Sequence, residues 1–192
     1  MSGRIVAVAN QKGGVGKTTT AISLGAALAA LERRVLLVDC DPQGNATRGL
    51  GGRAGEHHLY HALTGEVPLA GLLHPSGFPH LDLVPSDRDL VGVEVEFVGL
   101  DGWEGRLAAL LAPVRDRYDT ILLDCPPSLG HLTVLALAAA DGVLVPLQCE
   151  YFALEGVSDL LPTVRRVRGG NNPRLEIEGN VLTKYDERAN LS

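Results

Sequence analysis

Short continuous hydrophobic runs alternate along the chain with longer segments in which hydrophobic residues recur every three or four positions. The runs are typical of strands buried on both faces, whereas the longer spacing is typical of one face of a helix. Strands are expected at residues 5–9, 35–38, 81–85, 120–123, 142–145 and 175–182. Helices are expected at residues 18–31, 89–95, 103–114, 132–140 and 154–164. This alternation predicts an α/β fold with a mostly parallel central sheet and helices on both faces.

Two stretches depart from this regular alternation. Residues 48–79 are rich in Gly, His and Pro, and they predict a loop with short helices near residues 59–63 and 69–73. In the last helical segment, Pro162 is expected to kink or break the helix because proline lacks the backbone N–H. No repeat, low-complexity tract or internal boundary is visible, so residues 1–192 are expected to form a single domain.

The composition narrows the class of protein. Of the 192 residues, 45% are hydrophobic and only 4% aromatic, so Leu, Val, Ile and Ala must build the core. The formal net charge of −6 argues against a globally basic nucleic-acid binder, but it leaves room for a local basic face. Cys40, Cys125 and Cys149 lie far apart and predict reduced thiols rather than a zinc ribbon or a disulfide framework. The hydrophobic runs are too short for a signal peptide or a membrane span, which predicts a cytoplasmic protein.

A glycine-rich loop lies between the first expected strand and the first expected helix. Its glycines allow successive backbone N–H groups to point at one anion, and the helix N-terminus adds a favourable dipole. Lys17 can reach the β- and γ-phosphates of a nucleotide, and the Thr18 hydroxyl can bind magnesium. The candidate nucleotide-binding residues are Gly13, Gly14, Val15, Gly16, Lys17, Thr18 and Thr19.

The loop departs from the strict phosphate-loop pattern, GxxxxGK followed by Ser or Thr. Gln11 stands where that pattern requires its first glycine, and Lys12 adds a second lysine near the start of the loop. The alternative, an incidental glycine-rich turn with exposed lysines, is disfavoured by the surrounding strand–loop–helix order.

Acidic residues follow two of the expected strands. Asp39 and Asp41 follow the strand at residues 35–38, and Asp124 follows the strand at residues 120–123. Ligands of parallel sheets bind beyond the carboxyl ends of the strands, which is where these residues are expected. Asp124 has the position of a Walker B aspartate that holds magnesium through water. The alternative for each residue is that it caps a helix or ends a strand.

These segments resemble the ParA/Soj branch of the deviant Walker A ATPases, whose other members include MinD and the nitrogenase iron protein. The matching segments are residues 10–20, 38–45 (VDCDPQGN), 118–129 (YDTILLDCPPSL), 145–156 (VPLQCEYFALEG) and 185–192 (YDERANLS). The resemblance covers nearly the whole chain. It implies a P-loop NTPase fold that binds ATP and Mg²⁺ and hydrolyses ATP slowly.

The resemblance also implies a role for each motif. Lys12 would reach across an ATP-sandwich homodimer to the phosphates bound by the partner subunit. Asp41, in switch I, would orient the attacking water, and Asp39 would support the metal shell together with Thr18 and Asp124. Cys125, Pro126 and Pro127 would belong to switch II, with Cys125 as a small buried residue rather than a redox group.

A basic stretch follows near the end of the last helix. Arg165, Arg166, Arg168 and Arg174 form either a solvated helix face or a non-specific DNA surface that dimerisation completes. Lys184 and Arg188 are further DNA-binding candidates, and Arg188 lies where relatives in this family carry a DNA-contacting arginine.

The function implied by the resemblance is chromosome or plasmid segregation by a nucleoid-associated ATPase. Its ATP-bound dimer would bind DNA non-specifically, and a ParB-like partner would stimulate hydrolysis. The same switch could instead position a chemosensory array or a division factor, or the chain could bind nucleotide without turnover. Stable membrane association of the MinD kind is not expected, because no amphipathic terminal helix is present. Electron transfer is disfavoured because Cys125 and Cys149 do not stand in cluster-binding motifs.

Several features depart from the family pattern or remain open. The sequence ends at Ser192, short of the family's segment with the adenine-contacting loop, and too few residues precede Arg4 for a helix-turn-helix. Specific operator binding is therefore not expected. His57, His58 and His61 have a spacing that can bind zinc, although a solvated loop is favoured because no acidic or cysteine partner is near. Trp103 is expected to be a packing anchor or an interface residue.

Overall fold

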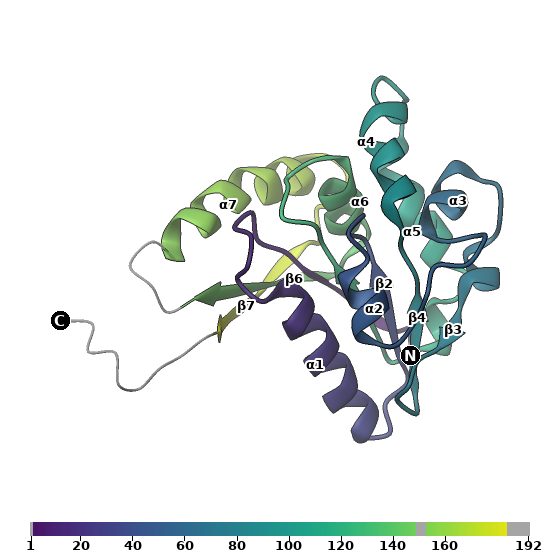
Figure 1. Ribbon diagram of the computed structural model, residues 1–192. Helices are drawn as coiled ribbons and strands as arrows, with labels where there is room; N and C mark the ends of the chain where they lie inside the picture. Colours follow the sequence, from purple (N-terminus) through teal and green to yellow (C-terminus); the bar gives the residue numbers. More distant parts are fainter. Residues whose placement is uncertain (1, 149–152, 184–192) are drawn as a thin grey trace.

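The computed structural model describes residues 2–148 and 153–183. This part of the chain forms a seven-stranded sheet in the order β3-β4-β2-β5-β1-β6-β7 (Figure 1). Neighbouring strands are parallel except for β3 and β4, which are antiparallel. The strands are β1 (Arg4–Val8), β2 (Val35–Asp39), β3 (His74–Pro75), β4 (Leu81–Val84), β5 (Thr120–Asp124), β6 (Gly142–Gln148) and β7 (Glu176–Thr183).

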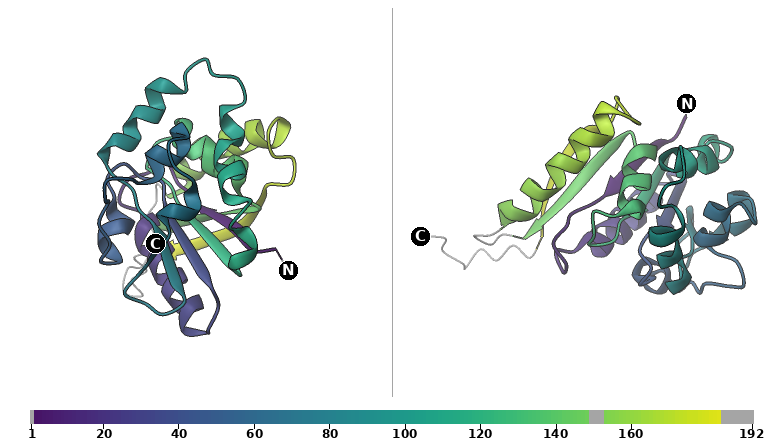
Figure 2. Two further views of the ribbon diagram at one scale, coloured as in Figure 1. Left: turned by 90° about the vertical axis from the view of Figure 1, so that its right-hand side faces the viewer. Right: turned by 90° about the horizontal axis from the view of Figure 1, so that it is seen from above.

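Helices fill the connections between the strands and cover both faces of the sheet. Figure 1 shows α1 on one side of the sheet and α6 and α7 on the other, and Figure 2 shows α7 running alongside β6. The α-helices are α1 (Lys17–Ala30), α2 (Asn45–Gly49), α3 (Leu59–Thr64), α4 (Val93–Glu96), α5 (Arg106–Leu111), α6 (His131–Ala139) and α7 (Ala153–Gly169). Short 3₁₀ segments are η1 (Leu69–Leu72), η2 (Arg88–Gly92), η3 (Trp103–Gly105) and η4 (Arg115–Arg117).

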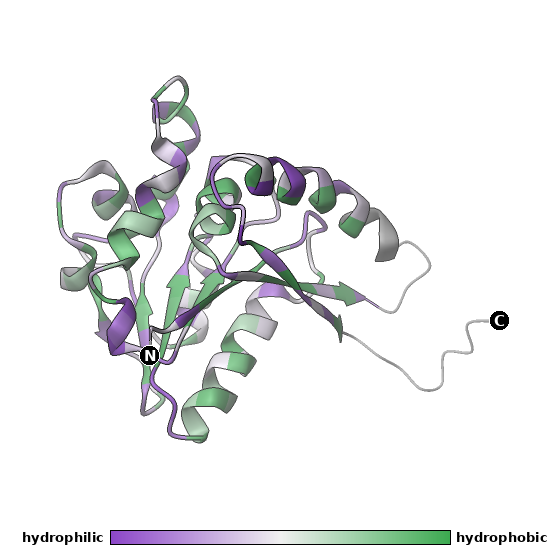
Figure 3. Ribbon diagram, turned by 180° about the vertical axis from the view of Figure 1, so that it is seen from behind, coloured by the Kyte–Doolittle hydropathy of each residue, from purple (hydrophilic) through white to green (hydrophobic). Residues whose placement is uncertain are grey.

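The continuous hydrophobic runs are explained by two hydrophobic cores, one on each face of the sheet. Leu122 of β5 packs with α1 and α2, whereas its neighbours Ile121 and Leu123 pack with α3, α5, α6 and α7. Successive side chains of a strand point to opposite faces, so a strand covered on both faces must be hydrophobic at every position. Figure 3 shows the hydrophobic residues concentrated along these central strands.

The predicted α/β fold, with its mostly parallel sheet and two helical layers, is confirmed. The structure corrects several details of the prediction. Short α2 and the two-residue β3 were not expected, and the single helix predicted at residues 89–95 is instead η2 followed by α4. The helix predicted at residues 103–114 is divided between η3 and α5. These pieces are too short to show a periodic hydrophobic pattern.

The predicted break at Pro162 is wrong, because α7 continues through this residue to Gly169. Proline removes one helical hydrogen bond, and its ring crowds the preceding turn. Leu160, Val164 and Val167 lie on one side of α7 and are buried against the sheet. Their burial offsets the cost of the proline, since packing of an apolar face supplies most of a helix's stability in a protein.

The two-core arrangement predicts how truncation of a β5 side chain affects stability. Leu122 has no exposed surface, so Leu122→Ala should lower the free energy of unfolding by about 2–5 kcal/mol through lost burial and the cavity left behind. Leu31 is 72% exposed, and Leu31→Ala should change the same quantity by less than about 0.5 kcal/mol. Urea denaturation of both variants measures the difference; equal losses would contradict the assignment of Leu122 to the core.

Candidate functional site

The candidate site lies at the carboxyl edge of the sheet, where β1, β2 and β5 end side by side. The register pairs Asp39 of β2 directly with Asp124 of β5, and Val8 of β1 with Asp124 on its other side. The glycine-rich loop leaves β1 at this edge and enters α1 at Lys17. Residues that are far apart in sequence therefore meet because three parallel strands end in register.

The glycine-rich loop has the backbone conformation of an anion-binding loop. Gly14 and Gly16 have φ values of 72° and 91°, a left-handed region that favours glycine, and Gly16 caps the N-terminus of α1. The first-turn N–H groups of a helix have no partner within the helix and attract anions. The 14-residue α1 has no acidic residue in its first turn to compete for these groups.

Side chains from two neighbouring strands hold this loop from outside. The Gln148 side-chain amide donates to the Gly14 carbonyl oxygen over 2.8 Å, and the Thr183 hydroxyl donates to the Val15 carbonyl oxygen over 2.6 Å. At the start of the loop, the Asn10 side chain donates to the Pro146 carbonyl oxygen over 2.8 Å and accepts from a loop N–H. The sequence prediction missed these contacts, since only the sheet order brings the ends of β6 and β7 to the loop.

Lys17 lies under the loop rather than in bulk solvent. Its side chain is buried, and its Nζ donates to the carbonyl oxygen of Lys12 over 3.0 Å. Burial lowers the pKa of this ammonium group, and the nearby carboxyl of Asp124 is the first of the groups that oppose the change. The ammonium group is therefore held close to the surface on which a phosphate would sit.

Asp124 is the most unusual group of the site. The residue has no exposed surface, and neither carboxylate oxygen has a hydrogen-bond partner among the residues that the structure describes. Burial raises the pKa of this carboxyl to about 7, and Asp39 and Asp41 add to the change. The Thr18 side chain, which is close to the carboxyl without forming a hydrogen bond of normal geometry, and the charge of Lys17 oppose it. A buried carboxylate without a partner is costly unless a cation joins it. Oxygen ligands of this kind, with the hydroxyl of Thr18 nearby, fit Mg²⁺.

Asp39 uses both of its carboxylate oxygens inside the protein. One accepts from the backbone N–H and the hydroxyl of Thr47, each over 2.7 Å, and the other accepts from the N–H of Asp41 over 3.2 Å. Burial raises the pKa of Asp39, and the bonds from Thr47 oppose that change. Because Thr47 lies in the first turn of α2, this arrangement matches the helix-capping alternative for Asp39.

Asp41 faces the same cavity from the loop that follows β2. One carboxylate oxygen of Asp41 accepts from the Gln43 N–H over 2.9 Å. The backbone carbonyl oxygen of Asp41 accepts from the Gly44 N–H and the Ser86 hydroxyl. The cavity has a volume of about 320 Å³. It is lined by Gly13, Gly14, Gly16, Lys17, Thr18, Thr19, Asp41, Gln43, Asn45 and Pro127. The structure thus brings the glycine loop, the loop after β2 and the loop after β5 around one space.

The remaining candidate residues lie in different surroundings. Cys125 and Cys40 are buried, and burial raises the pKa of each thiol, which keeps them protonated and unreactive. Cys149, Lys184 and Arg188 lie outside the described residues. Arg165, Arg166 and Arg168 are exposed near the end of α7, where Figure 3 shows a strongly hydrophilic stretch, and Arg174 is exposed in the segment after the helix.

The histidine cluster does not form a metal site. Within the described part of the chain, no group of three or more His, Cys, Asp or Glu residues could hold a metal ion. The expected solvated loop is wrong for His58, which is buried as the N-cap of α3 with its ring 4.5 Å from that of His61. Trp103 packs against Phe97 and His131, as expected of a packing anchor.

Comparison with known proteins identifies the family. A family model described as an AAA domain matches residues 3–177. The chromosome partitioning protein ParA of Myxococcus xanthus is 55% identical over 192 residues, which cover 99% of this chain and 68% of that protein. The chromosome-partitioning ATPase Soj of Thermus thermophilus is 57% identical over 190 residues, or 98% of this chain and 72% of that protein. The chain belongs to the ParA/Soj family of chromosome-partitioning ATPases.

A solved structure shares the fold of this chain. Cobyrinic acid a,c-diamide synthase from Mycobacterium smegmatis, with bound ADP and magnesium, superposes with a TM-score of 0.92 at 44% identity, covering 97% of this chain and 76% of that one. The resemblance to ParA/Soj proteins and the prediction of an ATP hydrolase are therefore confirmed. Within the described residues of this ParA/Soj chain, no helix is both long and apolar enough to cross a membrane.

The buried carboxyl of Asp124 predicts a pH-dependent stability of the nucleotide-free protein. A folded-state pKa of about 7, above the ordinary 3.8, favours the folded state at low pH, and this contribution is lost as pH rises from about 4 through about 7. Asp124→Asn should therefore unfold at a higher temperature than the wild type above about pH 7, and the difference should vanish near about pH 4. A difference of about 4 kcal/mol is the upper limit.

Thermal unfolding at a series of pH values, without and with Mg-ATP, measures this effect. Mg-ATP should stabilise the wild type much more than Asp124→Asn, which reverses their order. The control is Asp116→Asn, an exposed carboxylate whose replacement should matter little at any pH. A gap between Asp124→Asn and the wild type that does not vary with pH would contradict the assignment of an unpartnered buried charge.

Proposed function

We propose that this chain is a Mg-ATP-dependent segregation switch that pairs into a nucleotide-sandwich dimer and binds DNA non-specifically while ATP is bound. A ParB-like partner then stimulates hydrolysis, which ends the preference for the dimer and releases the DNA. The proposal places the protein in the cytoplasm on the nucleoid. The single observation that supports it most is the buried, unpartnered Asp124 beside Lys17 and a glycine loop.

Binding of the triphosphate relies on the loop and the start of α1. The N–H groups of residues 13–19 point at the phosphate oxygens, and the dipole of α1 favours their negative charge. Lys17 exchanges its bond to the Lys12 carbonyl oxygen for a phosphate oxygen. The Thr18 hydroxyl and Asp124 would hold a magnesium ion, whose charge would neutralise the β- and γ-phosphates.

The hydrolytic step relies on Asp41 and on a second copy of the chain. Asp41 borders the cavity beside Gln43, where its carboxylate orients the attacking water toward the γ-phosphate. Lys12 of the second copy brings an ammonium group to the same phosphates. Asp39 keeps the loop after β2 in place through Thr47. Cys125, Pro126 and Pro127 follow Asp124 as switch II, and Pro127 borders the cavity directly.

The role of Lys12 in the dimer generates the first test of this proposal. Lys12→Ala should bind ATP with nearly unchanged affinity, since Lys17 remains, but should lose hydrolysis by roughly 10³-fold or more, as for other cations supplied in trans. Light scattering with size exclusion should show a dimer for Asp41→Ala in ATP and a monomer in ADP. Arg33→Ala removes an exposed cation elsewhere and serves as the control. A mass that does not depend on the nucleotide would contradict the switch.

The basic end of α7 generates the second test. The double variant Arg165→Glu/Arg168→Glu should weaken ATP-dependent DNA binding, because both side chains are exposed and can contact phosphates. The slope of log affinity against log salt should fall by about two. Arg33→Glu/Arg117→Glu makes the same charge change at two exposed residues that precede β2 and β5, away from α7 in the sequence, and should retain the slope. Equal losses in both double variants would indicate a general charge effect and refute a DNA surface on α7.

A further inference from the structure

A carboxylate from α4 holds the start of α6. The Glu94 side chain accepts from the His131 N–H over 2.8 Å and from the Leu132 N–H over 3.2 Å, and it lies 3.0 Å from Nδ1 of His131. These are first-turn N–H groups of a nine-residue helix capped by Gly130. A carboxylate at this place satisfies donors that the helix itself leaves without partners and interacts favourably with the helix dipole.

The start of α6 follows closely after switch II. Only Leu129 and Gly130 separate the helix from residues 124–128, and the Thr133 hydroxyl donates back to the Ser128 carbonyl oxygen over 2.5 Å. Any movement of the loop after Asp124 must therefore be absorbed in a few residues or passed to the first turn of α6. Glu94 restrains that turn.

The segment that ends at Glu94 contacts switch I at its other end, through Ser86. The Ser86 N–H donates to the Thr47 hydroxyl over 3.0 Å, and the Ser86 hydroxyl donates to the Asp41 carbonyl oxygen over 2.8 Å. Residues 86–94 are here named the bridge segment. They comprise the end of the loop between β4 and η2, η2 itself and the start of α4. Leu90 and Val93 anchor the bridge segment in the core with no exposed surface. Its two ends are therefore fixed to different switch loops by a short, packed piece of chain.

We infer that the bridge segment couples switch I to switch II, and that Glu94 is a positioning residue for ATP hydrolysis. This inference rests on the proposed roles of Asp41 and of the loop after Asp124. Glu94 lines neither the nucleotide cavity nor the glycine loop. It acts through α6: while its carboxylate holds the first turn, switch II adopts one position relative to Asp41, and without it the two loops move independently.

The close packing of Gly130 against the Glu94 carboxylate supports the inferred role of Glu94. A Cβ atom at this position would lie 2.5 Å from both carboxylate oxygens of Glu94. The φ of Gly130 is −77°, which any residue can adopt, so a side chain here is opposed by the nearby Glu94 carboxylate, which would have to move, rather than by backbone conformation. Gly130→Ala therefore displaces the Glu94 carboxylate while leaving every polar group of the network in the chain.

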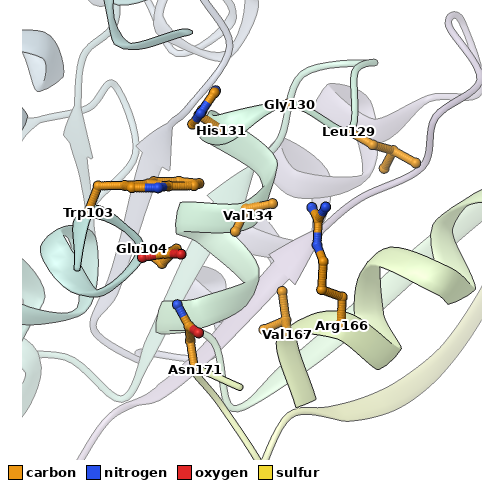
Figure 4. A pocket seen from close by; sticks show the side chains of 9 residues that line it. All are labelled: Trp103, Glu104, Leu129, Gly130, His131, Val134, Arg166, Val167 and Asn171. Atoms are coloured by element: carbon orange, nitrogen blue, oxygen red, sulfur yellow. The ribbon is translucent and has the colours of Figure 1, made fainter. Parts of the chain in front are cut away.

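The chain contains its own spectroscopic reporter. Trp103 is its single tryptophan, and its ring centroid lies 4.5 Å from that of His131. Figure 4 shows the two rings close together at the edge of a cavity of about 380 Å³ that α6, α7 and η3 border. A shift of the first turn of α6 changes the surroundings of the indole, so tryptophan fluorescence reports the position of this turn.

Steady-state hydrolysis and fluorescence of the full chain test the inference. Glu94→Ala should lower kcat by about tenfold, leave KM for ATP within about twofold, and abolish the ATP-dependent fluorescence change. Glu94→Gln keeps an oxygen acceptor for the helix and should recover much of kcat. The matched control is Glu96→Ala, two residues away on the same helix, where the carboxylate accepts from the Tyr60 hydroxyl instead.

A double-mutant cycle tests the coupling itself. Ser86→Ala removes the hydroxyl bond to the Asp41 carbonyl oxygen and keeps only the backbone bond to Thr47, so it weakens the switch I end. Ser86→Ala/Glu94→Ala should then lower kcat by clearly less than the product of the two single effects. Gly130→Ala should reproduce Glu94→Ala in kcat and fluorescence. Multiplicative effects, or a Glu94→Ala variant that matches Glu96→Ala in kcat and fluorescence, would overturn the inference. Asp41→Ala is measured in parallel: retained hydrolysis there refutes the proposed role of Asp41, independently of Glu94.

Discussion

A negative charge that the fold buries and leaves unpaired governs the architecture of this site. Asp124 stands at the end of the central strand β5, between β1 and β2, with no exposed surface and no internal hydrogen-bond partner in the described chain. Such a group opposes folding unless positive charge is close. Lys17 and the positive end of α1 provide part of that charge, and in the proposed function a magnesium-bound nucleotide would complete it. The proposal therefore links nucleotide affinity and fold stability to the same buried carboxyl.

The strand register places a second carboxyl next to Asp124 at the carboxyl edge of the sheet. The parallel strands β2 and β5 are paired in register along their whole length, so their last residues, Asp39 and Asp124, lie side by side. The two residues nevertheless have different hydrogen-bonding environments. Thr47 and the Asp41 N–H donate to Asp39, so it stabilises the loop after β2, whereas the oxygens of Asp124 have no such donors in the described chain and would be available to a cation. The two paired positions therefore differ because Thr47 and the Asp41 N–H reach only one of them.

Sequence reasoning reached the fold class and the glycine loop because both depend on local patterns. Buried strands require unbroken hydrophobic runs, and an anion-binding loop requires glycines followed by a helix. It could not reach Gln148 or Thr183, whose hydrogen bonds to the loop depend on sheet order rather than on spacing. It also expected Pro162 to kink or break the last helix, whereas the helix continues through it, because burial of Leu160 and Val164 is a tertiary effect. The buried state of His58 escaped it for the same reason.

The hydrogen bond from Thr183 connects β7, the last strand of the described residues, to the glycine-rich loop. Val15 and Thr183 are 168 positions apart, yet a single hydroxyl joins the last residue of β7 to the centre of the glycine loop. The final residue of β7 therefore fixes part of the backbone of the loop that is proposed to bind the phosphates, so a change at Thr183 would reach that loop through Val15 rather than through a contact of its own with ATP.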